Sequence, residues 1–486
     1  MGKSTHPKKK KKVVPKKKPA SKTQKDKTEK LQADLPNLPL PLTTTTPFDG
    51  KKFMAQLLEY LPEQRPEARS ELRWGSGFDG LDTITQALSC LEVQHEHAFG
   101  AEISKTAATW VLKRAGPKHL FQDVMHTSRS SAYCLTHGQK CKVPGSDLQL
   151  YAAGNSCKSN SIRNPKRWTD NPMQGESGST FSMTVDVLVK WQPRFFLIEN
   201  VVGARPERYV FQLVRPCKVG SAADSQDKKS PLEIYLETLR SRLPGYDIEW
   251  VEVGGHPLPE RRERLWILGS RDPEFGGKAW TDKVRELELK CVTSLPIVHL
   301  STMFEKGGDA QPPPPAADPS WKDEATYHST FAKMMSRSIE QKKVTKDAHI
   351  KPLKERASQV MPALGRFTAW QKANVDALEV ILNQTATRVP KSFPLLPIAD
   401  ISQSTAFART SVVGTWSTLT TATMILNFQT GKIEPPRSHF QMLGWPADVE
   451  LKGFSDPELY DMCGNAMSVA AVCKVLAPVL RHLKCF

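Results

Sequence analysis

Two short apolar runs constrain the fold of this chain more than any other feature. Residues 148–153 form the first run, and the polar loop that follows it contains Cys157. Residues 194–198 form the second run, which continues directly into Glu199. Runs of this length, bounded by turn residues, are typical of buried strands in a parallel sheet. Because ligands bind beyond the carboxyl ends of such strands, the two runs predict that a thiol and a carboxyl group meet in one pocket.

Length and composition place the chain among folded proteins with more than one lobe. A chain of 486 residues, 39% of them hydrophobic and 24% charged, is longer than a single compact core requires. No apolar run approaches 18 residues, so we expect no transmembrane helix. The lysine-rich start has no apolar segment behind it, so we expect no secretory signal. The nine cysteines are scattered and odd in number, which favours free thiols in a reducing compartment.

Most of the positive charge lies at the start of the chain. Residues 1–30 contain 13 lysines against two acidic residues, so they carry +11 of the formal net charge of +17. The lysine runs at 8–12 and 16–18 resemble nuclear-import signals, and they would equally serve as an arm that binds nucleic acid nonspecifically. A solvated tail with neither role is the third possibility. We expect residues 1–47, which are rich in Lys, Pro and Thr, to be disordered.

Three short segments in order indicate a site for a nucleoside-type cofactor. The first is a glycine-rich turn between an expected strand and helix, where backbone amides approach a ligand, with Gly77, Phe78 and Gly80 at its centre. Glu102 then ends a second expected strand, at the place where such folds bind ribose hydroxyls. Asp123 follows a third apolar segment, where a carboxylate would accept a hydrogen bond from an adenine amino group. Glycine-rich turns alone are common, so the prediction depends on the order of the three segments.

Cys157 and Glu199 differ from ordinary buried residues of their types. Cys157 lies in a loop rich in Gly, Asn and Ser, where a thiolate would be accessible and stabilised. Glu199 follows an apolar strand, and we expect desolvation to raise the pKa of its carboxyl group until it can donate a proton to a ring nitrogen. The alternative for Glu199 is a strand-end residue that caps the next segment.

Two arginines precede another expected strand. Arg262 and Arg264 alternate along the segment 259–264, so their side chains would share one face and address the same anion or base. The alternative is a solvated, charged strand edge.

Cys134, His137 and Cys141 have a spacing, Cys-x2-His-x3-Cys, that could hold zinc. A fourth ligand is not evident in the sequence. We therefore predict ordinary loop residues here and no metal site.

The second half of the chain predicts a smaller module and then a return to the first. Residues 307–318 contain four consecutive prolines, which predict a stiff linker, and the basic residues 322–358 are predicted to be helical. The apolar segment 463–483 predicts one long helix, with Asn465 at its N-terminus, where a helix suits a polar ligand.

Taken together and in this order, the motifs resemble those of the cytosine-5 methyltransferase family, from about residue 70 to residue 483. Members of that family use S-adenosylmethionine to methylate DNA, or transfer RNA in one branch. The resemblance implies that Gly77, Phe78 and Gly80 form the cofactor loop, that Glu102 and Asp123 bind ribose and adenine, and that Asn465 completes the cofactor site.

The catalytic motifs of the family are matched as well. The resemblance implies that Cys157 is the nucleophile that adds to the pyrimidine ring. Residues 199–201 match the family's Glu-Asn-Val motif without change, and they make Glu199 the partner of the ring nitrogen and the exocyclic amine. Arg262 and Arg264 match the two arginines of the Gln-x-Arg-x-Arg motif, where Arg262 would hold the base carbonyl and Arg264 would support the loop or a phosphate.

Four positions depart from the family's pattern. Ser156 replaces the proline before the nucleophile, and Lys158 replaces the glutamine after it. Glu260 replaces the glutamine of the arginine motif, and Ala466 follows Gly-Asn where serine is usual. The nucleophile, the Glu-Asn-Val motif and both arginines are retained, so we expect a divergent member.

The resemblance implies an α/β fold, with a Rossmann-like class I methyltransferase domain built on a mixed, mostly parallel sheet and a smaller target-recognition domain. We expect the first part of the catalytic domain in residues 48–274 and the target-recognition insert in residues 275–400. Residues 401–486 would complete that insert and return to the catalytic domain. The remaining segment, 1–47, would be the basic tail.

The leading hypothesis is a DNA (cytosine-5-)-methyltransferase of the nucleus that uses S-adenosylmethionine, flips its target base out of the stack and acts as a monomer. We expect no protein partner and no membrane association. The first alternative is an RNA (tRNA) methyltransferase on the same scaffold, although the long insert and the lysine tail favour DNA. The second is a non-catalytic nucleic-acid-binding relative, which the altered loops motivate.

Overall fold

The structure is a computed structural model that describes residues 43–61, 69–114, 116–161, 164, 172–205, 229–304, 324–341, 343–344, 357–361, 364 and 367–485. Residues 42–486 form one compact unit. The tail predicted for residues 1–47 lies outside the described residues except at its end. There, β1 (Thr43–Thr44) pairs in parallel with β11 (Ile297–Val298), so the predicted disorder extends too far along the chain.

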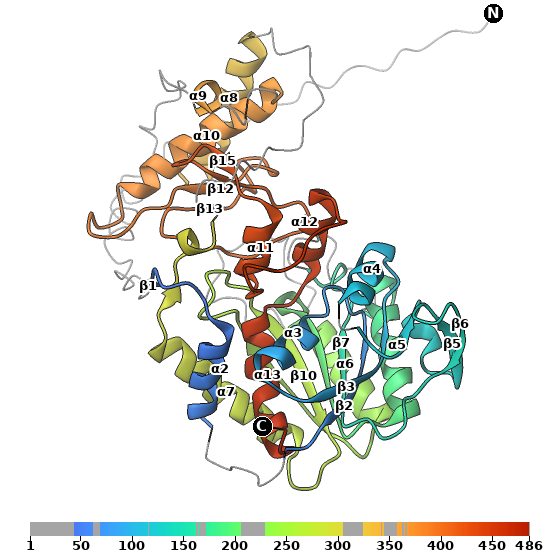
Figure 1. Cartoon of the computed structure of the whole chain (residues 1–486). Helices are drawn as coiled ribbons and strands as arrows, with labels where there is room; N and C mark the ends of the chain where they lie inside the picture. The colour runs from blue at the N-terminus through green and yellow to red at the C-terminus, as the bar shows by residue number, and fades with distance from the viewer. Residues whose placement is uncertain are drawn as a thin grey trace, which may run out of the picture. The chain divides into compact units, whose positions relative to one another are not determined.

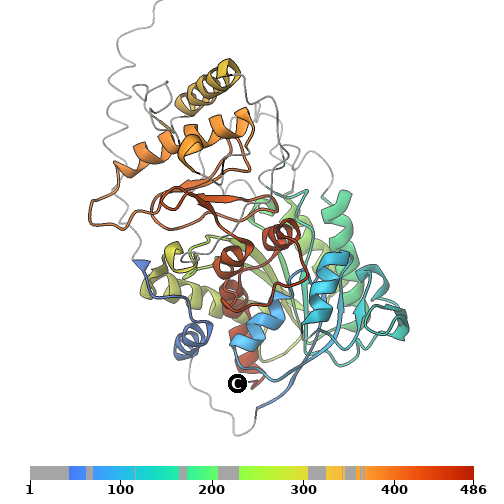
Figure 2. The same cartoon turned by 45° about the horizontal axis from the view of Figure 1, so that its top comes forward.

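A nine-stranded sheet forms the centre of the unit (Figures 1 and 2). Its strands, in spatial order, are β6 (Gln139–Lys142), β5 (Ser131–Cys134), β4 (Leu120–Phe121), β3 (His95–Ala101), β2 (Leu72–Gly77), β7 (Leu150–Gly154), β8 (Phe195–Val201), β10 (Arg264–Ser270) and β9 (Asp247–Val253). Within this sheet only β5 and β10 run against the direction of the others. This arrangement confirms the predicted Rossmann-like methyltransferase fold with a mixed, mostly parallel sheet.

Alternate residues of the strands bury into different cores on the two faces of the sheet. In β10, Trp266 and Leu268 belong to one core, and Leu265 and Ile267 belong to the other. The first core also takes side chains from α2 (Gly50–Glu59), α3 (Thr83–Cys90), α7 (Gly277–Ser294) and α13 (Val469–His482). The second takes side chains from α5 (Gly175–Trp191) and α6 (Pro231–Arg242). Strands that are buried on both faces are apolar along their whole length, which is why the apolar runs in the sequence predict β7 and β8.

Helix α7 packs in the first core, although its residues fall within the insert predicted for 275–400. Trp280 is fully buried and donates a hydrogen bond from Nε1 to the carbonyl of Val475 in α13 at 2.8 Å. Val284, Leu287 and Cys291 follow at helical spacing and are buried as well. The predicted start of the insert is therefore too early, and the other boundaries within 48–486 stay predictions.

The segment predicted as one long helix from residue 463 is divided between two helices. α12 (Asp456–Asn465) ends at Asn465, and α13 begins at Val469 after a bend of 42°. No single helix among the described residues is long and apolar enough to cross a membrane, although α12 and α13 taken together meet that test of length and composition. α13 is almost entirely buried in the first core.

A third core belongs to a separate group of elements, which gathers at one end of the unit (Figure 1, top). The group contains α8 (Glu324–Glu340), α9 (Ala357–Val360), α10 (Ala369–Ala386) and the antiparallel sheet of β13 (Thr410–Ser411), β12 (Ile398–Asp400), β14 (Ile425–Asn427) and β15 (Lys432–Ile433). The chain then returns to the large sheet through α11 (Pro436–Met442) and α12.

We expect Trp280→Ala to lower the free energy of unfolding by about 3–5 kcal/mol, because it opens a cavity between α7 and α13 and removes the bond to Val475. Trp370→Ala is the matched control, since Trp370 is 43% exposed on α10, and it should change stability by less than about 0.5 kcal/mol. Urea unfolding followed by circular dichroism measures both. Equal losses for the two variants would contradict the central position of α7.

Candidate active site

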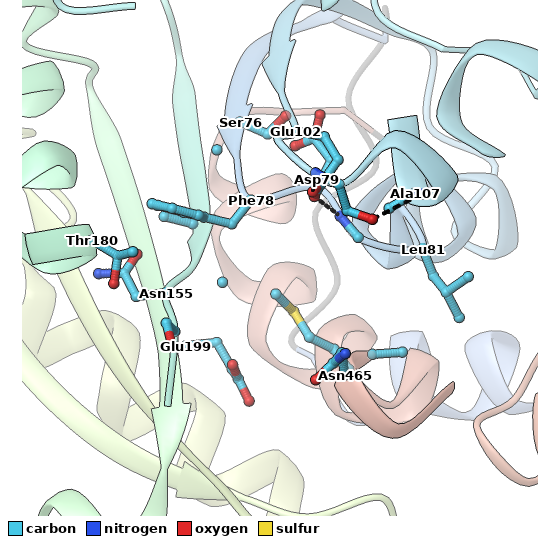
Figure 3. Close-up of a pocket in the computed structure, with 18 of the residues that line it drawn as sticks. Ser76, Phe78, Asp79, Leu81, Glu102, Ala107, Asn155, Thr180, Glu199 and Asn465 are labelled. Carbon is cyan, nitrogen blue, oxygen red and sulfur yellow. Dashed lines mark hydrogen bonds between the residues drawn. The ribbon is translucent and has the colours of Figure 1, made fainter. Parts of the chain in front are cut away.

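One pocket of about 510 Å³ lies at the edge of the sheet where the parallel strands end (Figure 3). β2, β3, β4, β7 and β8 reach this edge with their carboxyl ends, and the antiparallel β10 begins there. All ten residues that the sequence singles out line this pocket, namely Gly77, Phe78, Gly80, Glu102, Asp123, Cys157, Glu199, Arg262, Arg264 and Asn465. The sheet therefore brings together residues that are up to 388 positions apart in the chain.

The turn between β2 and α3 shapes one wall of the pocket. Phe78, Gly80 and Asp82 all have positive φ angles, of 61°, 53° and 55°. For Phe78 this conformation costs about 1 kcal/mol, and the bond from its amide to the carbonyl of Ala101, at 2.8 Å, helps to hold it. The phenyl ring of Phe78 consequently reaches into the pocket (Figure 3).

Glu102 is held by two backbone amides. Its Oε2 accepts from the amide of Gly80 at 2.8 Å, and its Oε1 accepts from the amide of Ser104 at 2.7 Å. Burial raises the pKa of this carboxyl group, and the two amide bonds oppose that shift. Glu102 also lines the pocket, so its carboxylate is held where a ligand could donate further hydrogen bonds to it.

Asp123 and Asn465 lie at other parts of the pocket wall. Asp123 is half-buried, and its Oδ1 accepts from the amide of Met125 at 2.8 Å. Asn465 is exposed at the last position of α12, so its predicted place at a helix N-terminus is wrong. The preceding residue, Gly464, is required for packing, because a Cβ atom there would come within 2.1 Å of the amide nitrogen of Thr421.

The loop that carries Cys157 is anchored through the two residues that depart from the family's pattern. Ser156 donates from Oγ to Glu176 at 3.0 Å, and the ammonium group of Lys158 bonds the same carboxylate at 3.1 Å. Glu176 lies in the first turn of α5, and the amide of Ser159 also bonds that helix, at the Oγ of Ser177 at 3.0 Å. The side chains of Ser156 and Lys158 therefore add two contacts between the loop and α5.

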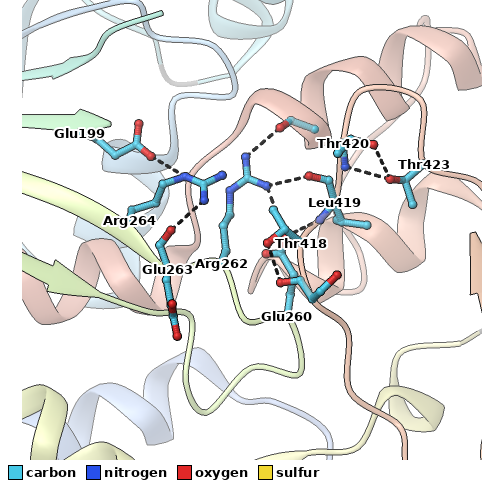
Figure 4. A network of polar contacts seen from close by, with 11 residues as sticks. Glu199, Glu260, Arg262, Glu263, Arg264, Thr418, Leu419, Thr420 and Thr423 are labelled. Atoms are coloured by element: carbon cyan, nitrogen blue, oxygen red, sulfur yellow. Dashed lines mark hydrogen bonds and ion pairs between the residues drawn. The ribbon is translucent and has the colours of Figure 1, made fainter. Parts of the chain in front are cut away.

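Glu199 and Arg264 form an ion pair within the pocket (Figure 4). Nε of Arg264 lies 2.8 Å from Oε1 of Glu199, and both side chains are 11% exposed. Burial raises the pKa of Glu199, while the charges of Arg264 and Arg262 oppose that rise. The carboxyl group can therefore take up a proton more readily than an exposed glutamate, as the sequence predicted.

Arg262 is directed to other partners. It is buried and donates to Glu260 at 3.3 Å, to the carbonyl of Leu419 at 3.4 Å and to the carbonyl of Gly464 at 2.8 Å (Figure 4). Both arginines line the pocket and their charges act on Glu199, so the prediction that they address the same anion or base stays a prediction. β10 begins only at Arg264, so Arg262 lies before the strand and its alternation.

The electrostatics around Cys157 keep its thiol protonated at rest. Burial raises the pKa of Cys157 first, and the negative charge of Glu199 raises it further. Arg264 and Arg262 act in the opposite direction. Any change that neutralises Glu199 therefore favours the thiolate.

Sequence reasoning missed Asp79 as a pocket residue. Its carboxyl group lies beneath the turn against Gly100, where a Cβ atom would come within 2.1 Å of Oδ2. Burial, followed by the charge of Asp82, raises its pKa well above the usual value. An acid between Phe78 and Gly80 in the glycine-rich turn was the signal that could have revealed it. Sequence reasoning also missed His119, which lies outside this pocket beside Cys134, His137 and Cys141.

Comparisons with known proteins agree with the geometry. No protein-family model matches the chain. The chain is 31% identical to the DNA (cytosine-5-)-methyltransferase DMT5 of Cryptococcus neoformans var. grubii over 133 residues, which are 27% of this chain and 6% of that protein. It is 25% identical to the orphan methyltransferase M.Rho11sI of Bacillus phage rho11s over 213 residues, which are 43% of this chain and 35% of that protein.

These relatives confirm the predicted resemblance to cytosine-5 methyltransferases, although the chain spans only 6% and 35% of their lengths. Among solved structures, the chain is similar to the crystal structure of the S. pombe Dnmt2 methyltransferase, with a TM-score of 0.42 and 12% identity, covering 85% of this chain and 99% of that one.

We expect Glu199→Gln to accelerate alkylation of Cys157 by iodoacetamide at pH 8, because removing the negative charge lowers the pKa of the thiol. The measurement is the pH dependence of alkylation at Cys157, followed by peptide mass spectrometry. Glu263→Gln is the control, since that exposed side chain does not contribute to the pKa of Cys157, and its profile should match the unaltered protein. An unchanged profile for Glu199→Gln would refute the coupling.

Proposed function

We propose that this protein transfers a methyl group from S-adenosylmethionine to the 5-position of cytosine in DNA, through a covalent adduct with Cys157. One observation carries the proposal. The Cys157 thiol and the Glu199–Arg264 ion pair line the same pocket as the Glu102 carboxylate, which two amides hold in place. A nucleophile, a partner for a pyrimidine ring and an acceptor for ribose hydroxyls therefore face a single cavity.

The residues of the pocket fit the cofactor. The oxygens of Glu102 would accept the two ribose hydroxyls, and the half-buried Asp123 would accept from the adenine amino group. Phe78 offers an aromatic face from the turn, and Asn465 offers an amide from α12. S-adenosylmethionine supplies an electrophilic methyl group when it is bound.

The residues of the chain account for the remaining chemistry. The Cys157 thiolate would add to carbon 6 of cytosine, and the electron pair of the 5,6 double bond would bond carbon 5 to the methyl group of the cofactor, whose carbon–sulfur bond would break so that the thioether leaves. Protonated Glu199 donates to ring N3 and supports this shift of charge. A base then removes the proton from carbon 5, and ring N3 returns its proton to Glu199. The bond between carbon 6 and the Cys157 sulfur breaks, which restores the double bond and the thiolate.

Arg264 is the better candidate for the base carbonyl. It lies beside the carboxylate that would bind N3, whereas Arg262 is committed to Glu260, Leu419 and Gly464. We therefore exchange the roles expected from the motif. Arg264 would contact the substrate, and Arg262 would hold the pocket wall.

DNA is favoured as the substrate by two features. The Cryptococcus relative is named as a DNA methyltransferase, and the sequence carries 13 lysines within its first 30 residues, where a basic arm would bind phosphates or direct the chain to the nucleus. The target cytosine would leave the duplex stack to reach Cys157. RNA is the second candidate substrate, since the chemistry at the base is the same.

We expect labelled methyl groups to pass from S-adenosylmethionine to DNA and not to transfer RNA, and we expect Cys157→Ser to reduce transfer to the enzyme-free background. Cys90→Ser is the control, because Cys90 lies on α3 outside the pocket. DNA with 5-fluorocytosine at the target should trap a covalent complex, since the fluorine cannot leave as a proton does, and peptide mapping should locate it at Cys157.

Transfer to RNA alone would overturn the choice of substrate. Absence of transfer to either nucleic acid, with folded protein that still binds the cofactor, would favour the non-catalytic relative.

We expect Glu102→Gln to weaken the binding of S-adenosylmethionine about tenfold to a hundredfold, because an amide loses one charged acceptor and turns an N–H group toward a donor. Isothermal titration calorimetry measures this loss. Glu96→Gln on β3, the strand that leads to Glu102, is the control, since Glu96 bonds Arg73 away from the pocket. Unaltered affinity in Glu102→Gln would contradict the assignment of the ribose site.

A further inference from the structure

Four metal-binding side chains meet at the edge of the nine-stranded sheet, outside the pocket. They are His119, Cys134, His137 and Cys141, and their ligand atoms all lie within 4.8 Å of one another. The sequence revealed three of them. His119 is the fourth, and β4 brings it to the hairpin of β5 and β6 although it lies 15 residues before Cys134.

Three of the distances within this cluster are close to those between neighbouring ligands of a tetrahedral metal site, and the remaining ones are no longer than 4.8 Å. Nδ1 of His137 lies 3.2 Å from Sγ of Cys134 and 3.6 Å from Sγ of Cys141, and Nδ1 of His119 lies 3.8 Å from Sγ of Cys134. Zinc bonds of about 2.3 Å to sulfur and about 2.0 Å to nitrogen place neighbouring ligands of a tetrahedron roughly 3.3–3.8 Å apart. The four side chains therefore surround a position where one ion would fit.

Backbone pairing brings the ligands together independently of any metal. Cys134 pairs with Phe121 across β5 and β4, and the amide of Leu135 bonds the carbonyl of Leu120 at 2.6 Å. The amide of Leu120 in turn bonds Oγ1 of Thr136 at 2.9 Å. Cys134 is buried, whereas His137 is exposed, so an ion could enter from solvent and be covered on one side.

We propose that His119, Cys134, His137 and Cys141 bind one Zn²⁺ ion as a structural site. Two thiolates and two imidazoles form one of the ligand sets that zinc takes in closed, four-coordinate sites. With four protein ligands, no position remains for water or substrate, so the role is structural and not catalytic.

The site would stabilise a wall of the pocket. The segment between His119 and Cys134 contains Asp123 and Val124, which both line the pocket, and Val124 packs against Gly77 of β2. A bound ion would close this segment as a loop and restrict its motion, as a cross-link does. The zinc site and the proposed catalytic function are independent, because neither requires the chemistry of the other.

Zinc content of the purified full chain tests the proposal directly. After purification without chelators, we expect elemental analysis to find about one Zn²⁺ per chain. His119→Ala and Cys134→Ser should lose it. Cys90→Ser and His126→Ala are the matched controls, because neither residue belongs to the cluster, and both should retain it. Metal-free wild-type protein that takes up no added zinc would overturn the proposal, as would equal zinc content in His119→Ala.

Cobalt substitution gives a readout that does not depend on stability. Co²⁺ in this site should show the intense visible bands of four-coordinate cobalt and a sulfur-to-cobalt charge-transfer band, and Cys141→Ser should weaken the latter while leaving the fold measurable by circular dichroism. A disulfide between Cys134 and Cys141, found by counting thiols in protein purified under reducing conditions, would also overturn the proposal.

Discussion

The buried ion pair between Glu260 and Arg262 joins three segments on which the pocket depends. Arg262 bonds the carbonyls of Leu419 and Gly464, and Glu260 accepts from the amide of Leu419 at 2.7 Å. Removing one partner of such a pair typically costs about 3–5 kcal/mol, because the other charge is left buried alone. Substituting glutamate for the family's glutamine at this position therefore gives Arg262 a charged partner and commits it to structure.

With Arg262 bonded elsewhere, Glu199 and Arg264 form the ion pair beside Cys157 in the pocket. Glu199 and Arg264 pair where both side chains are mostly buried, and both influence the thiol of Cys157. Because a low dielectric strengthens each interaction, a substrate that alters the charge of Glu199 would alter the reactivity of the thiol in the same step. Under the proposed function, the ion pair would couple binding of a base to activation of the nucleophile.

The sequence predicts the parts of the site that depend on single strands. Apolar runs ending at Gly154 and Glu199 define β7 and β8, and the parallel order places their ends at one edge. Prediction from the sequence fails where packing between segments far apart in the chain determines the structure. Thr421 lies against Gly464 near the end of α12, α7 packs on α13 through Trp280, and His119 becomes a neighbour of Cys134 only through strand pairing.

The position of α12 and α13 has a consequence for how the protein is made. Gly77 is synthesised well before Asn465, although both residues line the same pocket. α13 shares the first core with residues of β2 and β7, so a chain that has not yet formed α13 leaves part of that core exposed. Long-range contacts of this kind slow folding, because the entropy of loop closure opposes them until both segments are in place.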